Sequence, residues 1–313
     1  MPEALVPADP PAATLRVAAG SAGAPVNRHD GQVRAAFRRF LRHRLAVLGA
    51  ILMLAIITLA VLAPLVAPQS PTFIDLSAVR EPPSAAHWLG TDLSGRDVWS
   101  RIVYGARTSL TVGFGAVGLY VLIGTILGML AGYFGGTIDM AIMRLTDTVM
   151  SVPSLLMVIV FVSVVGPSLI SVLAVIGLLG WPGAARLVRG QFLSLREAEF
   201  VTAARVVGVS DMRIIVGHML PNILGPLIVL ATFGVASAVI LEASLSFLGL
   251  GVRPPVPSWG DMLNAAQSPT VLLDVQWLWV SPAVAIAITV LAVNFVGDGV
   301  RDAFDPRAAR RGG

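Results

Sequence analysis

The chain has 313 residues, of which 56% are hydrophobic and 13% charged, and its formal net charge is +4. Soluble globular domains carry about twice that share of charge, so the composition excludes this class and favours a protein embedded in a bilayer. Cysteine is absent and all 22 basic residues are arginine, which excludes disulfides and thiolate metal sites and gives no sign of a nucleic-acid surface.

The first 44 residues divide into two parts of different composition. Residues 1–33 are rich in Pro, Ala and Gly without a periodic apolar pattern, which predicts a disordered N-terminal tail. Residues 34–44 contain five arginines beside Phe37, Phe40 and Leu41. This mixture predicts a basic amphipathic helix that lies on an anionic lipid surface.

Six apolar segments are long enough to cross about 30 Å of hydrocarbon. Only helices satisfy their own backbone hydrogen bonds in lipid over such lengths, so we predict an all-α, polytopic membrane protein with six transmembrane helices over residues 45–300. A C-terminal tail is expected over residues 301–313. The expected spans are approximately 45–67, 110–134, 141–165, 169–189, 223–249 and 280–296.

The arginines are distributed unevenly between the two sides of these spans. If the N-terminus is cytoplasmic, 17 of the 22 arginines lie on the cytoplasmic side and 5 on the other. Because cytoplasmic loops carry an excess of basic residues, both termini are expected in the cytoplasm. The charged loop over residues 193–222 is then cytoplasmic as well.

The loop before the second span carries a dense run of polar and aromatic residues. The segment 87–110 contains the sequences HWLGTD, GRD and YGAR, and it resembles the stretch before the second span in permeases of dipeptide and oligopeptide transporters. Its two aspartates are expected to neutralise Arg96 and Arg101. A direct role with substrate and an interfacial collar without a transport role are both open. The signature residues are Gly90, Thr91, Asp92, Gly95, Arg96 and Asp97.

Asp147 and Glu242 are acidic residues within or near the predicted spans. A carboxylate at membrane depth is costly, so each is expected to face the helix bundle, a cavity or a partner. For Asp147, pairing with Arg144 one turn away is the favoured interpretation. For Glu242, a place on the translocation path beside Ser244 and a packing hydrogen bond are both open.

Residues 193–222 form a charged, helix-forming loop between two very hydrophobic segments. Good helix formers lead to Gly208, where a glycine commonly ends a helix because it accepts the left-handed conformation. Ser210 is expected to cap a second helix, which begins with Asp211 and continues to Pro221. The pattern predicts two helices joined at a glycine hinge.

The spacing in this loop resembles the EAA loop of permease subunits in ABC-type importers. Thr202-Ala203-Ala204 is followed by Gly208 and Leu220-Pro221 at the expected intervals, although Thr202 replaces the usual Glu and His218 a frequent Ile. The resemblance implies that the loop binds a groove of a cytoplasmic ATPase subunit. An ordinary amphipathic loop on the bilayer surface is the alternative. The residues implied in coupling are Glu199, Thr202, Ala203, Ala204, Arg205, Gly208, Asp211, Arg213 and Pro221.

The last loop, residues 251–279, has three prolines before Trp259 and again resembles the peptide permeases. These prolines are expected to exclude a helix and to form a stiff connection between the last two spans. Nucleotide-binding, zinc-protease and nucleophile-elbow motifs are absent from the sequence, so we do not expect an enzyme. No metal or cofactor site is indicated in this chain.

The resemblance covers nearly all of the chain beyond its N-terminal tail and implies the transmembrane domain of a type I ABC importer. It implies the shorter permease of a heterodimeric pair that carries dipeptides or oligopeptides across the bacterial inner membrane. The implied partners are a second homologous permease, two ATPase subunits that bind ATP and Mg²⁺, an extracytoplasmic peptide-binding protein and membrane lipid. A nickel-chelate importer of the same family and an ion-coupled secondary transporter are the alternatives.

Overall fold

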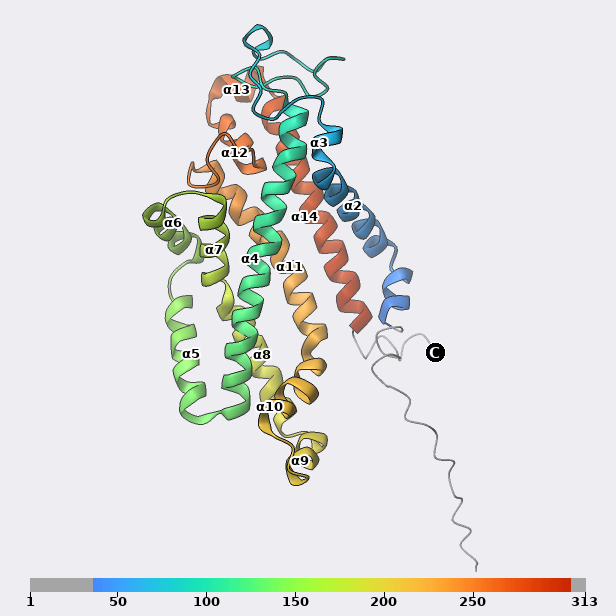
Figure 1. Cartoon of the computed structure of the whole chain (residues 1–313), viewed down its shortest axis with the longest axis vertical. Coiled ribbons are helices and arrows are strands. Elements are labelled where there is room, and N and C mark those ends of the chain that lie inside the picture. The colour runs from blue at the N-terminus through green and yellow to red at the C-terminus, as the bar shows by residue number, and fades with distance from the viewer. Residues whose placement is uncertain (1–35, 305–313) are drawn as a thin grey trace, which may run out of the picture.

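The computed structural model describes residues 36–304, and within this range the regular secondary structure is helical apart from one isolated bridge between Thr91 and Asp97. The predicted all-α class is therefore confirmed. Figure 1 shows an elongated bundle with short helices and loops at both ends. The predicted tail over residues 1–33 lies outside the described residues.

The ends of the described region differ from the predicted boundaries. Residues 36–42 of the predicted basic helix are helical, and His43 then interrupts the chain before the first span. The His43 side chain caps that span by accepting a hydrogen bond from the Ala46 N–H. At the other end, the last helix continues to Phe304, so the predicted tail begins later than residue 301.

Between residues 36 and 304, five helices or continuous helical runs are long and apolar enough to cross a bilayer by length and composition. Several extend well beyond the predicted spans, because polar residues at each end continue the helical hydrogen bonding outside the apolar stretch. The five are α2 (Arg44–Val61), α4 (Val98–Phe134), the pair α7 (Leu169–Leu179) and α8 (Trp181–Arg196), the run α10 (Asp211–Arg213), η2 (Ile214–Met219) and α11 (Leu220–Phe247), and α14 (Trp277–Phe304).

The predicted span over residues 141–165 is not one continuous helix. It is divided into α5 (Gly136–Met150) and α6 (Ser154–Val165), which are bent by 84° relative to each other. Pro153 stands at the break, where it cannot donate a backbone hydrogen bond and disfavours helical geometry in the residue before it. The described chain reaches six spans only if this bent pair counts as one.

Helix α4 is the centre of the bundle and contacts α2, α7, α8 and α11. Glycines on one of its faces let α8 approach closely. A methyl group on Gly128 would lie 2.6 Å from the Ala185 carbonyl oxygen, and one on Gly132 would lie 2.9 Å from the Arg189 carbonyl oxygen. Small residues thus permit backbone contact between these helices, as is common inside membranes.

The segments 68–97 and 250–276 meet at one end of the bundle, and together they are called the cap. Short helices occupy the second segment: α12 (Trp259–Asn264), η3 (Ala265–Gln267) and α13 (Pro269–Asp274). The expectation that prolines exclude a helix here is wrong. Pro254, Pro255 and Pro257 precede Ser258, whose side chain caps α12 by accepting from the Asp261 N–H, and Pro269 stands in the first turn of α13, where a missing N–H is tolerated. The first segment contains η1 (Leu76–Ala78), and α3 (Ala63–Val66) precedes it in the chain.

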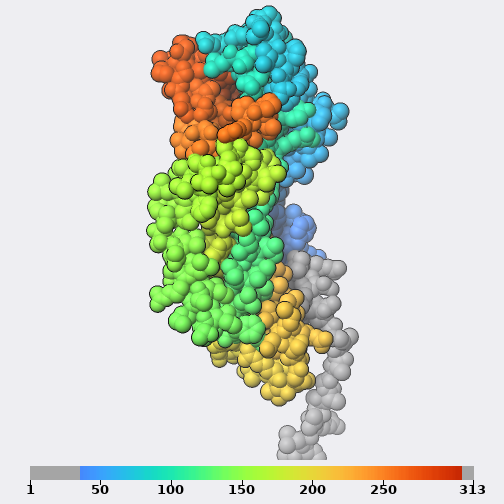
Figure 2. All heavy atoms as spheres, turned by 60° about the vertical axis from the view of Figure 1, so that its left-hand side comes forward, coloured from blue at the N-terminus to red at the C-terminus, as the bar shows by residue number. Residues whose placement is uncertain are grey.

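Loop 193–222 projects from the opposite end of the bundle. Figure 2 shows its residues in yellow to gold at the lower end of the molecule, with the cap in cyan and orange at the far end. The loop begins within α8 and contains α9 (Glu199–Val206), followed by α10 and η2. The two motif-bearing regions are therefore separated by the full length of the helical bundle.

Candidate functional site

Loop 193–222 has the predicted glycine hinge, and a second helix begins at Asp211 as predicted, but its cap and its end differ from the prediction. α9 ends just before Gly208, whose φ of +81° lies in the left-handed region that favours glycine. Ser210 makes no capping hydrogen bond, contrary to expectation. The following helix does not stop at Pro221, because this proline lies in the first turn of α11, where a missing N–H is tolerated.

The loop is anchored to the end of α4 through Tyr133. The Tyr133 hydroxyl donates to the Asp211 carboxylate, and the Arg205 guanidinium lies 5.2 Å from the centroid of the Tyr133 ring. Beneath these contacts, Val201 and Ile214 are fully buried in one apolar cluster with Phe192 of α8. The role of Tyr133 was not predicted, because its contacts involve residues more than seventy positions away in the chain.

The outward surface of the loop is unusually apolar. Val206 is 83% exposed, Val207 81% and Met212 70%. Of the residues implied in coupling, Ala204 and Pro221 are half-buried and the other seven are exposed. An exposed apolar patch rimmed by polar side chains commonly marks an interaction site.

The signature residues of the first cap segment are mostly buried. The Asp92 carboxylate accepts hydrogen bonds from the backbone N–H groups of Ser94 and Arg96, and lies 2.7 Å from the Arg96 Nε and 3.7 Å from the Arg101 Nε. The chain turns around this carboxylate, and positive φ angles at Gly90 and Gly95 permit the turn.

Asp97 does not neutralise an arginine, contrary to expectation. Its carboxylate caps α4 by accepting from the Ser100 N–H at 2.8 Å, and it lies 3.0 Å from the His87 Nδ1. Thr91 is also fully buried, and its carbonyl oxygen accepts from the Trp277 Nε1 at 3.2 Å. These bonds tie the first cap segment to the start of both α4 and α14.

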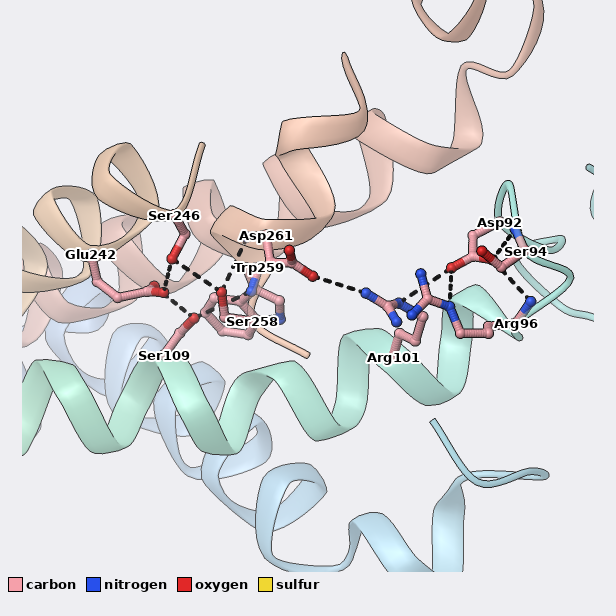
Figure 3. Close-up of polar contacts among 10 residues, drawn as sticks. All are labelled: Asp92, Ser94, Arg96, Arg101, Ser109, Glu242, Ser246, Ser258, Trp259 and Asp261. Carbon is pink, nitrogen blue, oxygen red and sulfur yellow. Dashed lines mark hydrogen bonds and ion pairs between the residues drawn. The ribbon is translucent and has the colours of Figure 1, made fainter. Parts of the chain in front are cut away.

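Arg101 joins the two segments of the cap. Its Nη2 lies 3.0 Å from an oxygen of the Asp261 carboxylate on α12, while its Nε faces Asp92 (Figure 3). The residue is only 4% exposed. Burial raises the pKa of the Asp261 carboxyl, whereas the adjacent Arg101 guanidinium acts in the opposite direction. The guanidinium therefore offsets the cost of two partly buried carboxylates.

Glu242 lies farther along α11, where it is fully buried against α4. Its two oxygens accept hydrogen bonds from the Ser109 hydroxyl at 3.0 Å and the Ser246 hydroxyl at 2.7 Å, as Figure 3 shows. This geometry corresponds to the packing alternative, and a place on a translocation path stays a prediction. Ser244 is half-buried, and its hydroxyl donates to the Ile240 carbonyl oxygen of its own helix.

Asp147 does not pair with Arg144. Its carboxylate lies 2.5 Å from the Arg186 Nη2 of α8, and the neighbouring Asp139 likewise pairs with Arg189 at 2.5 Å. Because α5 lies beside α8, both carboxylates meet an arginine across the helix interface. The sequence did not predict these pairs, because nothing in a local pattern specifies which helix lies beside α5. Within residues 36–304, no cluster of three or more possible metal ligands occurs.

Comparisons with known proteins agree with this architecture. Residues 31–83 match the N-terminal transmembrane domain of oligopeptide transport permease C, and residues 124–310 match the binding-protein-dependent transport system inner membrane component. A dipeptide transport system permease protein of Alkalihalophilus pseudofirmus is 44% identical over 88% of this chain and 90% of its own length.

Two further relatives are also named as permeases. The dipeptide transport system permease protein of Bacillus subtilis is 42% identical over 88% of this chain and 86% of its own. A Brucella suis protein that is provisionally named a peptide permease is 43% identical over 91% of this chain and 95% of its own. The chain therefore belongs to the family of inner membrane components of binding-protein-dependent transport systems, with the transmembrane domain of a type I ABC importer.

Proposed function

We propose that this chain is a membrane permease subunit of an ATP-driven importer of dipeptides or oligopeptides and forms half of its translocation path. The observation that carries the proposal is loop 193–222, which is fixed to the bundle on one side and exposes apolar residues on the other. A partner that grips the exposed side can move the helices attached to the buried side. We call this segment the coupling loop from here on.

The proposed partners follow from the two ends of the molecule. Two ATPase subunits, which bind ATP and Mg²⁺, would contact the coupling loops of this chain and of a second, homologous permease. An extracytoplasmic peptide-binding protein would dock on the opposite side, where the cap lies. The proposed location is the bacterial inner membrane with both termini in the cytoplasm, as the arginine distribution favours.

Two helices connect the coupling loop with the cap. η2 continues without interruption into α11, which carries Glu242 near its other end. α4 contacts the coupling loop through Tyr133 and holds Glu242 through Ser109. When ATPase closure displaces the coupling loop, both helices are displaced together, and the bundle can alternate between two orientations of its path.

Peptide transport is proposed because the relatives are named peptide or dipeptide permeases. A nickel chelate is not favoured by these names. An ion-coupled secondary transporter is not favoured either, since the family depends on a binding protein.

The test is reconstitution of the chain with its partner subunits in liposomes. Labelled dipeptide should accumulate only with ATP and the binding protein, and the ATPase subunits should copurify in constant proportion. An Ala204→Glu variant should assemble and hydrolyse ATP but accumulate little peptide, because the charge disturbs the contact that transmits motion. Full uptake by this variant would refute the coupling role, and ATP-independent uptake would refute the importer.

A further inference from the structure

A cavity of about 430 Å³ lies where the two interrupted spans meet α4 and α11. Its walls come from the break between α5 and α6, from the junction of α7 and α8 at Gly180, and from Tyr120 and Ser237 of the two long helices. The lining is mainly apolar with a few hydroxyl groups. This volume and composition are typical of a site for a small molecule.

The helix break makes this cavity a poor place for a lipid chain. Ser154 opens α6, and no side chain caps the first turn of this helix. Interrupted backbone is tolerated at membrane depth only where protein buries it or where it lines a cavity that holds water. Ser154 lines the cavity, and a hydrocarbon occupant would offer its polar groups no hydrogen-bond partner. An occupant with polar groups of its own can satisfy them.

An ion pair lies one helical turn from the lining of the cavity. Gly183 and Met150 line the cavity, and Arg186 and Asp147 lie one helical turn away from them on α8 and α5. The Arg186 side chain is 46% exposed and the Asp147 side chain 55%. Charged side chains within spans face a partner or a water-filled space, so this pair is accessible to water and presents one charge of each sign.

We propose that the cavity receives an apolar side chain of the transported peptide, while the Arg186 and Asp147 pair one turn from its lining contacts a charged terminus of the same peptide. This inference rests on the proposed function and assigns a subsite to it. Met150 and Met157 line the walls, and methionine adapts its shape to different neighbours. Such walls suit a carrier whose substrates differ in side-chain size.

Gly183 offers a way to fill the cavity without distorting the fold. A Cβ at this position meets no atom within 4 Å, so Gly183→Leu can extend into open space. Gly190 is a matched control, because it lies on the same helix two turns away, has equally open surroundings and does not line the cavity. Uptake of dialanine and diphenylalanine is measured in liposomes with the complete transporter and saturating binding protein.

Filling the cavity should discriminate against the larger substrate. We expect Gly183→Leu to lower the ratio of diphenylalanine to dialanine uptake by about tenfold or more, and Gly190→Leu to keep the wild-type ratio. If Gly183→Leu leaves the uptake ratio unchanged, whether or not total uptake falls, the inference is overturned. Peptide uptake by the wild type would still support the proposed function in that case. No peptide uptake by the wild type would instead refute the proposed function.

A photoreactive peptide tests the occupant directly. A dipeptide that carries a benzophenone side chain is added to the complete transporter, and the mixture is illuminated. The labelled residue is then identified by mass spectrometry. We expect labelling at Met150 or Met157 that excess dialanine reduces. Labelling confined to lipid, to the second permease or to other parts of this chain would contradict the assignment.

Discussion

The cap buries charged side chains and the coupling loop exposes apolar ones. Each arrangement costs free energy. Charged side chains are buried at the cap: Asp97 is only 1% exposed, and Arg101 of α4, which joins the two cap segments, is only 4% exposed. In the coupling loop, apolar side chains are exposed, with Val206 and Val207 above 80%. The buried charges of the cap find counter-charges within this chain, whereas the exposed apolar surface of the loop is the face that the proposed ATPase contact would cover. The two ends therefore differ in what holds them in place: buried ion pairs fix the cap, whereas the loop depends on an apolar cluster and on the Tyr133 contact.

This contrast fits the way the two ends are connected. Arg101 of α4 pairs with Asp261 of the cap, and the Ser109 hydroxyl of α4 contacts both Glu242 of α11 and the Trp259 N–H of the cap. The cap should therefore move with these helices as one unit. Tyr133 provides the corresponding contact at the other end, but its partner Asp211 is exposed. We therefore expect substitutions to affect stability most in the cap and coupling most in the loop.

The largest expected loss of stability follows Arg101→Met. Removing a buried guanidinium leaves Asp92 and Asp261 without their shared cation, which should lower the free energy of unfolding by about 3–5 kcal/mol. Thermal unfolding in detergent measures this loss. The double variant Arg101→Met with Asp261→Asn should recover part of it, because one uncompensated carboxylate is removed. Additive losses in the double variant would contradict the pairing.

The same variant should show a distinct pH dependence. Burial already raises the pKa of Asp261, and the Arg101 guanidinium opposes that shift. Without the guanidinium, the carboxyl should take up a proton more readily in the folded state than in the unfolded state. The stability deficit should then shrink as the pH falls toward the ordinary carboxyl range and grow as it rises. A deficit that does not vary with pH would show that Asp261 is not the affected group.

A smaller effect is expected at Glu242. Glu242→Leu leaves the Ser109 and Ser246 hydroxyls without their acceptor, which should cost about 1–3 kcal/mol. Glu242→Gln keeps one acceptor oxygen and should lose less. Thermal unfolding ranks the two variants, and peptide uptake shows whether the carboxylate also acts in transport. If Glu242→Gln is stable but transports no peptide, the role of this residue extends beyond packing.

Tyr133→Phe should have a still smaller effect on stability. It removes one hydrogen bond to an exposed carboxylate, so we expect a loss of about 0.5–1.5 kcal/mol at most. The coupling of ATP hydrolysis to transport should be affected more than stability, because the loop loses a contact with α4. The number of peptides imported per ATP hydrolysed should fall. A wild-type ratio would mean that α11 alone transmits the displacement.

The smallest stability change is expected for the double substitution of Val206 and Val207 to serine. Both side chains are exposed, and such surface changes usually alter the free energy of unfolding by no more than about 0.5 kcal/mol. The ATPase subunits should nevertheless copurify less well, because the apolar contact surface is reduced. Undiminished copurification would place the interface elsewhere.

The sequence was most informative where a property depends on local composition. Apolar length identified the spans, and the spacing around Gly208 identified the hinge. The bend at Pro153 was missed because the prediction rested on the apolar length of residues 141–165, and hydropathy says nothing about the direction of the chain on either side of a break. The Arg186 partner of Asp147 and the Asp261 partner of Arg101 were both missed. These pairs depend on which helices lie side by side, and local sequence does not specify this.

The most direct measurement uses the absence of cysteine from the chain. A single cysteine is introduced by Ala203→Cys in the coupling loop, or by Thr137→Cys as an exposed control at the start of α5. Each is labelled with a membrane-impermeant maleimide in inside-out vesicles, with and without the ATPase subunits. The account predicts that the ATPases protect Ala203→Cys and leave the control reactive. Equal labelling in both conditions, or labelling of Ala203→Cys only in right-side-out vesicles, would contradict it.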